Sequence, residues 1–553
     1  MANDPEWLVM LYLAGDNNLS SEMIWALKEI EDSSLPTGFR MTILYDPLSS
    51  CCPTYVYDLG GHTESGPEGA TPLVRPAHAP LPPISMNGKP SKIYEWVQDS
   101  SNPEVLRKFI EWSLVERNVV KRPPRYRMLV LSGHGSGAVG DFLTDDHVGN
   151  ERNRSLSIPS LEKALNEAQN HVRSSLKIEG KLIDVLGMDS CLMSMAEVCY
   201  QVRESVDYLV GSEGFVQNAG WPYGSLLKHL RARVDSNEEL TPKRIAGYVV
   251  QDYIAYYREY LPANVSVDMA ACEIAKLGHQ NEAHDSKTVR RRVRELTDLL
   301  IPPLRRCRPD DKPLSIDDRS IRDLVTMAHW RAQSYKFEQY TDLWDFCLQL
   351  RELGKSSTDR LVQEIVGAAG RVQNAIDESV GRTNGTAGRQ DYEGIEFQHS
   401  HGLSVYFPWS TAAFSEDDQK AYQELAFGSD SGWGDFLAEY LEGTRRELRT
   451  NGEVGLLKFG AGSEEAIRKR AAHRNAPESG KNAPESGKNA PESGKNAPES
   501  GKMLALLLGS SRLSMKNPPQ SVYLRPTPPK ADPREQQNLG NQVSDEEWTS
   551  QEK

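Results

Sequence analysis

Cysteine is scarce in this 553-residue sequence, and no motif pairs the cysteines that occur. There are seven of them, at irregular spacings and without a CxxC pattern. An odd number with such spacings argues against a disulfide framework and against a structural zinc site. We therefore expect reduced thiols, which are typical of a reducing compartment.

Long hydrophobic runs and an excess of basic residues are also missing. No apolar stretch approaches the roughly 20 residues that span a bilayer, and residues 1–15 carry no basic segment or cleavage site typical of a secretory signal. The formal net charge is -14, so there is no electrostatic footprint for nucleic acid. The sequence predicts a cytoplasmic protein that binds neither membranes nor nucleic acid.

Short apolar runs alternate with amphipathic segments along the first half of the chain. The runs at 7–15, 41–47, 126–135, 181–190 and 206–214 predict buried strands, and the segments between them favour helices. This alternation predicts an α/β fold with a mostly parallel sheet and helices on both faces. In such sheets, ligands bind beyond the carboxyl ends of the strands.

The chain after this first part has a different pattern. Residues 241–445 predict a mainly helical continuation, with strands returning at 265–274 and 402–408. The tail at 446–553 contains four tandem NAPESGK repeats (475–502), in which proline and glycine recur too often for a stable helix or coiled coil. We expect this tail to be disordered and to lie outside the two preceding regions, 1–240 and 241–445.

Two residues with complementary chemistry follow two of the predicted strands. His134 in SGHGSG stands at the end of the run 126–135, and Cys191 in GMDSC stands at the end of the run 181–190. If these parallel strands are neighbours, about 4.8 Å apart, both side chains emerge at the same edge of the sheet. A thiol nucleophile needs a base within reach and donors for an oxyanion, and the N–H groups of Gly135 and Cys191 are candidate donors.

Cys191 also stands where we expect a helix to begin. The N-terminus of a helix would lower the pKa of the thiol and favour thiolate. Each residue taken singly has a simpler interpretation, in which His134 is a turn residue and Cys191 only packs in the core.

Both motifs resemble those of the clostripain family of cysteine endopeptidases, relatives of caspases, gingipains, separase and legumain. The resemblance rests on LVLSGHGSG and IDVLGMDSCLMSMAEV, and continues in WLVMLYLAGDNNL, in FLTDD with SIPSLEKAL, and in GSEGFVQNAGWPY, GLSVYFP and WGDFLAEYL. It covers roughly residues 7–443. It implies a caspase-like α/β/α sandwich with residues 1–240 as the catalytic core, and a dyad of His134 and Cys191.

The resemblance further implies cleavage after Arg or Lys, with the base of the S1 pocket formed by Asp189, two residues before Cys191. A buried carboxylate pairs with a guanidinium or an ammonium group and repels an acidic side chain. We expect Glu213 to add negative charge to this pocket, and Trp221 and Tyr223 to form the cleft wall. Asp189 could instead cap the helix expected after it, and the two aromatic residues could only pack.

The chemistry itself requires no cofactor, but some relatives need calcium for activation. Asp16 and Asp46, at the ends of the first two strands, and the adjacent Asp145 and Asp146 are candidate ligands. Helix capping and a solvated turn are the alternatives, because a hard cation needs several converging oxygens.

Relatives also activate by cutting themselves. Arg152 and Arg154 lie in a polar loop after His134, where an arginine-specific site could act on its own chain. We therefore predict a cysteine endopeptidase that acts on proteins or peptides with Arg or Lys at the cleavage site. The alternatives are a catalytically silent scaffold of the same fold that binds protein partners, and a peptidase with another preference before the cleaved bond.

Overall fold

The computed structural model describes residues 6–48, 52, 54–59, 99–116, 123–146, 155–259, 265–278, 286–306, 316–336, 339–382, 388–409 and 416–450. All of them belong to one compact unit, Met1–Arg474. The repeats and the rest of the predicted disordered tail from residue 451 lie outside the described residues, as do Arg152 and Arg154.

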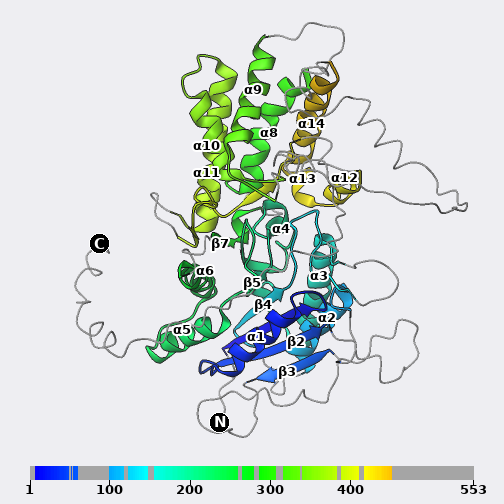
Figure 1. The fold of residues 1–553 in the computed structure, drawn as a ribbon, viewed down its shortest axis with the longest axis vertical. Coiled ribbons are helices and arrows are strands. Elements are labelled where there is room, and N and C mark those ends of the chain that lie inside the picture. Colours follow the sequence, from blue (N-terminus) through cyan, green and yellow to red (C-terminus); the bar gives the residue numbers. More distant parts are fainter. Residues whose placement is uncertain are drawn as a thin grey trace, which may run out of the picture. The chain divides into compact units, whose positions relative to one another are not determined.

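An eight-stranded sheet in the order β10-β7-β6-β5-β4-β1-β2-β3 forms the centre of this unit (Figure 1). Its parallel part consists of β1 (Trp7–Gly15), β2 (Phe39–Pro47), β4 (Tyr126–Ser132), β5 (Ile183–Asp189) and β6 (Val206–Gly211). Its antiparallel edges are β3 (Tyr55–Leu59) on one side, and β7 (Val267–Glu273) with β10 (Gln390–Glu393) on the other. The five strands predicted in the first half are confirmed, whereas β3 and β10 were not predicted.

Side chains of the central strand β1 alternate between two hydrophobic cores. Trp7, Val9 and Leu11 pack in one core, and Leu8 and Met10 pack in the other. All nine residues of the strand are buried. A continuous apolar run is what a parallel strand covered on both faces requires, so the run itself identified the strand.

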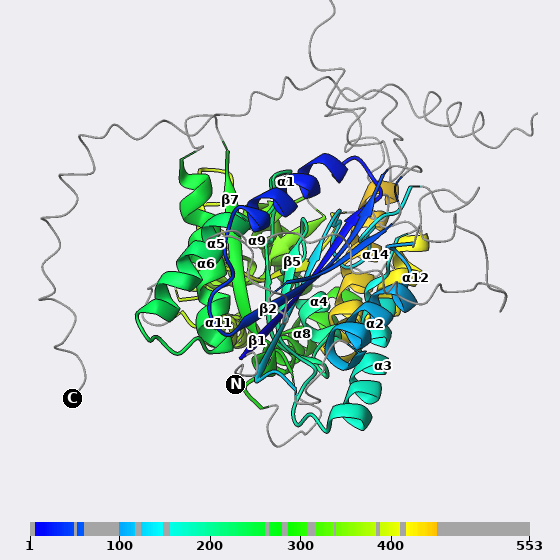
Figure 2. The same ribbon diagram turned by 90° about the horizontal axis from the view of Figure 1, so that it is seen from below.

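Helices cover both faces of the sheet (Figure 2). One face carries α1 (Ser20–Glu31), α5 (Tyr223–Asp235) and α6 (Pro242–Arg258), and the other carries α2 (Pro103–Glu111) and α3 (Ile158–Leu176). The α/β/α sandwich around a mostly parallel sheet is therefore confirmed.

The chain after residue 260 is mainly helical, as expected. Its helices are α8 (Val289–Arg306), α9 (Ile316–Arg331), α10 (Leu343–Gly354), α11 (Arg360–Val380), α12 (Glu416–Gln423), α13 (Ala426–Asp430) and α14 (Trp433–Thr450). A small antiparallel sheet combines β8 (Ser334–Tyr335), β9 (Tyr340–Asp342) and β11 (Ser404–Tyr406), of which β11 lies within the strand expected at 402–408. The strand expected at 265–274 is β7 of the central sheet. Strands β7 and β10 follow residue 240 in the chain but belong to the central sheet. The predicted boundary between two regions at residue 240 therefore stays a prediction.

The helix expected to begin at Cys191 begins later. Helix α4 spans Ala196–Gln201, and Leu192 has a left-handed φ of 63° that interrupts regular structure. The N–H of Ser194 donates to the carbonyl oxygen of Ser212 at 2.9 Å, and Met195 forms a parallel bridge with Ser404. The prediction was wrong because these contacts with distant segments outweigh the local helix propensity of LMSMAEV.

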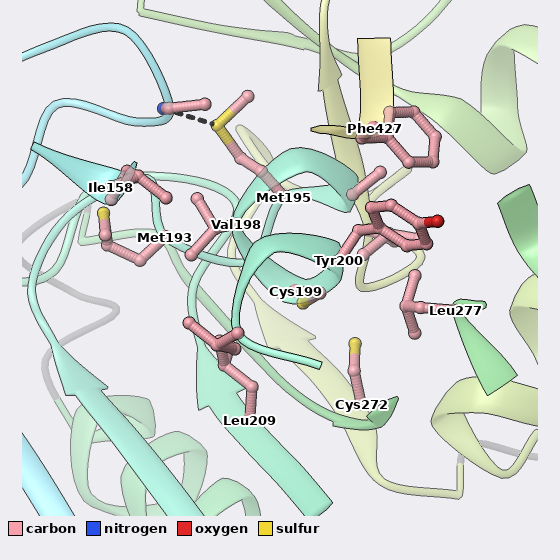
Figure 3. Close-up of a cluster of buried hydrophobic side chains, with 14 of the residues drawn as sticks. Ile158, Met193, Met195, Val198, Cys199, Tyr200, Leu209, Cys272, Leu277 and Phe427 are labelled. Carbon is pink, nitrogen blue, oxygen red and sulfur yellow. Dashed lines mark hydrogen bonds between the residues drawn. The ribbon is translucent and has the colours of Figure 1, made fainter. Parts of the chain in front are cut away.

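Helix α4 is anchored in an apolar cluster beneath the loop that carries Cys191. Figure 3 shows Val198 and Cys199 packed toward Leu209 of β6. In the same cluster, the N–H of Ala138 donates to the sulfur of Met195 at 3.2 Å (Figure 3). This bond ties the loop after His134 to the segment after Cys191.

Candidate active site

A small pocket of about 60 Å³ lies at the carboxyl ends of β4 and β5. His134, Cys191, Asp189 and Tyr223 are among the residues that line it. The two strands are adjacent and parallel, and their register pairs Ser132 with Asp189. The residues that follow each strand therefore emerge side by side, so the structure brings the histidine and the cysteine to one pocket.

The two motifs touch through their backbones at Gly135. A Cβ atom at this position would overlap the carbonyl oxygen of Cys191 and lie 3.0 Å from its backbone nitrogen. Any other residue would push the two loops apart, which explains the need for glycine here. Neither the N–H of Gly135 nor that of Cys191 donates to another residue in the described part of the chain. Both donors remain open to a developing oxyanion.

His134 is held by a residue that the sequence did not single out. Its Nε2 lies 2.5 Å from Oδ1 of Asn18, which follows β1. With this oxygen as acceptor, Nε2 carries the proton and Nδ1 is the free base. Burial lowers the pKa of His134, although the carboxylates of Asp146 and Asp141 act in the opposite direction. The ring is therefore neutral at pH 7.

The Cys191 thiol lies against the backbone of Val216. The Val216 N–H donates to Sγ at 3.3 Å, and Sγ lies 3.6 Å from the Val216 carbonyl oxygen. Burial raises the pKa of this thiol, the Val216 N–H partly offsets the rise, and the charge of Asp189 adds to it. The expected lowering of the pKa by a helix N-terminus is wrong, because α4 starts five residues further on. Thiol and imidazole are thus both neutral in this state.

Asp189 is buried beneath the pocket and fully hydrogen-bonded. Its carboxylate accepts from the Ser132 hydroxyl at 3.0 Å, the Tyr223 hydroxyl at 2.8 Å and the Trp221 N–H at 3.1 Å. Burial raises its pKa to about 6, while these three donors favour the charged form. Gly220 lies directly above it, and a Cβ there would be 2.9 Å from Oδ2. Glycine at this place leaves the carboxylate accessible from the pocket.

Glu213 and Trp221 do not line the pocket, in contrast to what we expected of them. Glu213 is fully buried and accepts from the Gly402 N–H at 2.6 Å; burial, with Asp342 and Asp268 nearby, raises its pKa. Trp221 is 1% exposed, and its ring packs on Gly187 of β5. The side chains of Glu213 and Trp221 therefore point into the protein interior, where they hold neighbouring backbone segments, and not into the pocket.

A second carboxylate does line the pocket, and sequence reasoning missed it. Glu22, in the first turn of α1, is half-buried, and its Oε2 is buried without a hydrogen-bond partner among the described residues. Leu19, Met23 and Ala26 from the same helix also line the pocket. The sequence did contain a signal for Glu22: it lies in the first turn of a helix that directly follows a predicted strand, at the edge of the sheet where ligands bind.

Three of the four candidate calcium ligands lie together. Asp16, Asp46 and Asp145 each offer a carboxylate oxygen, and these oxygens lie within 4.8 Å of one another. The Asp146 side chain is exposed instead, and its N–H donates to the Asp16 carbonyl oxygen at 2.9 Å. The two adjacent aspartates therefore differ in their surroundings: Asp145 belongs to the buried cluster, and Asp146 faces solvent.

Comparison with known proteins finds a family that matches most of the described region. The sequence model of the clostripain family matches residues 11–440. No curated protein gives a significant match. Similar solved structures include a secreted C11 cysteine protease from Bacteroides thetaiotaomicron in complex with an irreversible peptide inhibitor (16% identity, TM-score 0.49) and an inactive zymogen C11 protease from Parabacteroides distasonis (17% identity, TM-score 0.45). In both cases the match covers 78% of this chain and 99% of the other.

The cytoplasmic location expected from the sequence stays a prediction. Within the part of the chain that the structure describes, no helix is both long and apolar enough to cross a bilayer.

Proposed function

This chain belongs to the clostripain family and is a cysteine peptidase, and we propose that it cleaves peptide bonds after Arg or Lys through Cys191. One observation carries the proposal. A thiol, a neutral imidazole and a buried carboxylate line the same pocket at the edge of the sheet. These are a nucleophile, its base and a partner for a basic side chain.

The chemistry begins with two neutral groups. As Sγ of Cys191 attacks the carbonyl carbon of the substrate, Nδ1 of His134 takes the thiol proton. The carbonyl oxygen becomes an oxyanion and accepts from the N–H groups of Gly135 and Cys191. When the intermediate collapses, the amine leaves with the proton from His134, and a thioester remains. His134 then deprotonates a water molecule that hydrolyses the thioester and restores the thiol.

Recognition of the substrate relies on negative charge. The side chain before the cleaved bond enters above Gly220 toward Asp189, with Glu22 on the α1 side. No lysine or arginine is among the pocket's lining residues in the described part of the chain. Two carboxylates without a basic partner attract a guanidinium or ammonium group and repel an acidic one.

Fluorogenic peptides ending in Arg, Lys, Asp or Asn test the proposal when given to the parent chain, Cys191→Ala and Asp189→Asn. We expect signal from the Arg and Lys peptides only, lost in Cys191→Ala and strongly reduced in Asp189→Asn. Activity that survives in Cys191→Ala would refute the mechanism. Cleavage confined to the Asn or Asp peptides would refute the specificity and leave the nucleophile in place.

We extend the proposal to self-cleavage at Arg152 or Arg154. It is supported by their position among polar residues in the sequence after His134. Mass spectrometry of the purified parent should show two fragments that are missing from Cys191→Ala. Identical intact masses for the two proteins would exclude self-cleavage.

A further inference from the structure

A lysine from a distant part of the chain contacts the loop that follows His134. Lys336, in the turn after β8, donates from Nζ to the Ser136 carbonyl oxygen at 2.8 Å. The hydroxyl group of Tyr340, in β9, donates to the same oxygen at 2.5 Å. The two donors lie 200 and 204 positions from Ser136 in the sequence, so only the folded chain brings them together.

The side chain of Tyr340 also packs directly on this loop. Gly137 has a left-handed φ of 79°, and a Cβ atom there would lie 2.5 Å from Cζ of the Tyr340 ring. At the next residue, the Ala138 N–H donates to the sulfur of Met195 (Figure 3). The loop is therefore held at consecutive residues by other parts of the chain.

The side chain of Lys336 carries its charge to the Ser136 carbonyl oxygen. Burial lowers the pKa of Lys336 to about 8, while the carboxylates of Asp141 and Asp418 act in the opposite direction. At pH 7 the ammonium group is therefore mostly protonated. Among the described residues, the Ser136 oxygen is its only hydrogen-bond partner. A hydrogen bond from a charged donor is stronger than one between neutral groups.

The same loop determines the direction of the Gly135 N–H. The carbonyl oxygen of His134 accepts from the Leu143 N–H at 2.9 Å. In a trans peptide, a carbonyl and the N–H that follows it point to opposite sides, so this bond directs the Gly135 N–H away from Leu143. The carbonyl that Lys336 holds belongs to Ser136, the residue directly after Gly135. Without this contact, the peptide groups around Gly135 could rotate.

We propose that Lys336 positions the oxyanion donor Gly135 of the peptidase through the Ser136 carbonyl. This inference rests on the proposed function, in which the Gly135 N–H donates to the oxyanion. Lys336 does not line the pocket, so it is a positioning residue and touches no reacting atom. Its loss should weaken an interaction that exists only in the transition state, which lowers kcat and leaves KM unchanged.

Lys336→Met tests this role, because methionine is unbranched like lysine but lacks the ammonium group. The substrate is whichever fluorogenic peptide the parent cleaves best, so the test does not depend on the proposed specificity. We expect kcat to fall about tenfold, less than the roughly 10²–10³ lost with a whole oxyanion donor, and KM to stay within about twofold of the parent. Lys355→Met is the matched control, since the Lys355 side chain is 63% exposed and pairs with Glu352; it should keep the parental kcat.

Alkylation of Cys191 by iodoacetamide separates this role from a loss of folded protein. In this reaction Sγ bonds to the methylene carbon and iodide leaves, so no oxyanion forms. Lys336→Met should therefore alkylate at the parental rate while its kcat is lowered. A parental kcat would overturn the proposal, as would an equal loss of kcat and alkylation rate.

Two further controls complete the test. Melting temperatures check that Lys336→Met is folded, and Lys336→Gln, whose amide is too short to reach the Ser136 oxygen, provides the same comparison if it is not. Failure of the proposed function gives a different result, because the parent then cleaves no peptide or Cys191→Ala cleaves it at the parental rate. Either of these outcomes would overturn both proposals.

Discussion

Two buried acidic sites, Asp189 and the cluster around Asp46, lie at the same edge of the sheet. They differ in how many hydrogen-bond donors surround the carboxylate. Asp189 receives three hydrogen bonds, from Ser132, Tyr223 and the Trp221 backbone. Asp46 accepts from the Thr54 hydroxyl at 2.7 Å and lies beside Asp16 and Asp145, and its Oδ2 has no hydrogen-bond partner within the described part of the chain. Three donors stabilise the charged form of Asp189, whereas burial and the neighbouring charges of Asp145 and Asp16 raise the pKa of Asp46 and favour its protonated form.

The largest expected effect is on recognition by Asp189. Asp189→Asn should lower kcat/KM for an arginine peptide about 100-fold, because a charge-assisted contact is worth about 1.5–3 kcal/mol. Glu213→Gln is the matched control, since Glu213 is equally buried but does not line the pocket. If Glu213→Gln costs as much as Asp189→Asn while both variants melt like the parent, the pocket is wrongly assigned.

The pH dependence of substrate binding tests whether Asp189 acts through its charge. Burial raises the pKa of Asp189 to about 6, so its carboxylate is protonated as the pH falls through that value. An arginine peptide should bind Cys191→Ala about tenfold more weakly at pH 5 than at pH 7, because only about a tenth of the carboxylate stays ionised one unit below its pKa. Fluorescence anisotropy measures this affinity. A peptide with neutral citrulline in place of arginine should show no such change, and an equal change would contradict the role of charge.

Glu22 is expected to contribute less than Asp189, because it is only half-buried and solvent screens its charge. Glu22→Gln should reduce kcat/KM for arginine peptides about fivefold, in line with about 1 kcal/mol for a partly exposed pair. Glu31→Gln on the same helix is the control, since Glu31 pairs with Lys28 at 3.2 Å and does not line the pocket. If Glu22→Gln and the parent have equal kcat/KM for arginine peptides, Glu22 does not contribute to substrate recognition.

The smallest effect concerns the thiol. The charge of Asp189 raises the pKa of Cys191, so Asp189→Asn should lower that pKa and speed alkylation of Cys191 by iodoacetamide at pH 8, about twofold to threefold for a partly screened charge. In the parent, the alkylation rate should keep rising to pH 9 and above, because burial holds the pKa of the thiol above its usual range. A plateau near pH 7, measured by peptide mass spectrometry, would instead indicate a preformed thiolate. Asp46→Asn should alkylate at the parental rate.

The elements of the fold differ in how well local sequence predicted them. The parallel strands were found because both of their faces are buried, which makes each one a continuous apolar run. Strands β3 and β10 were missed because they lie at the edges of the sheet, where residues such as Asp58 and Asp391 interrupt the apolar pattern. The start of α4 was misplaced because residues 194 and 195 pair with segments far away in the chain.

Local sequence determined the two strands that precede His134 and Cys191, because a continuous apolar run is readable without a partner. Only the tertiary structure decided what joins them. Strand β1 lies between β2 and β4, so Asn18, Glu22 and the three clustered aspartates arrive at the same edge. Strand order depends on packing between segments distant in sequence, and no local pattern specifies it.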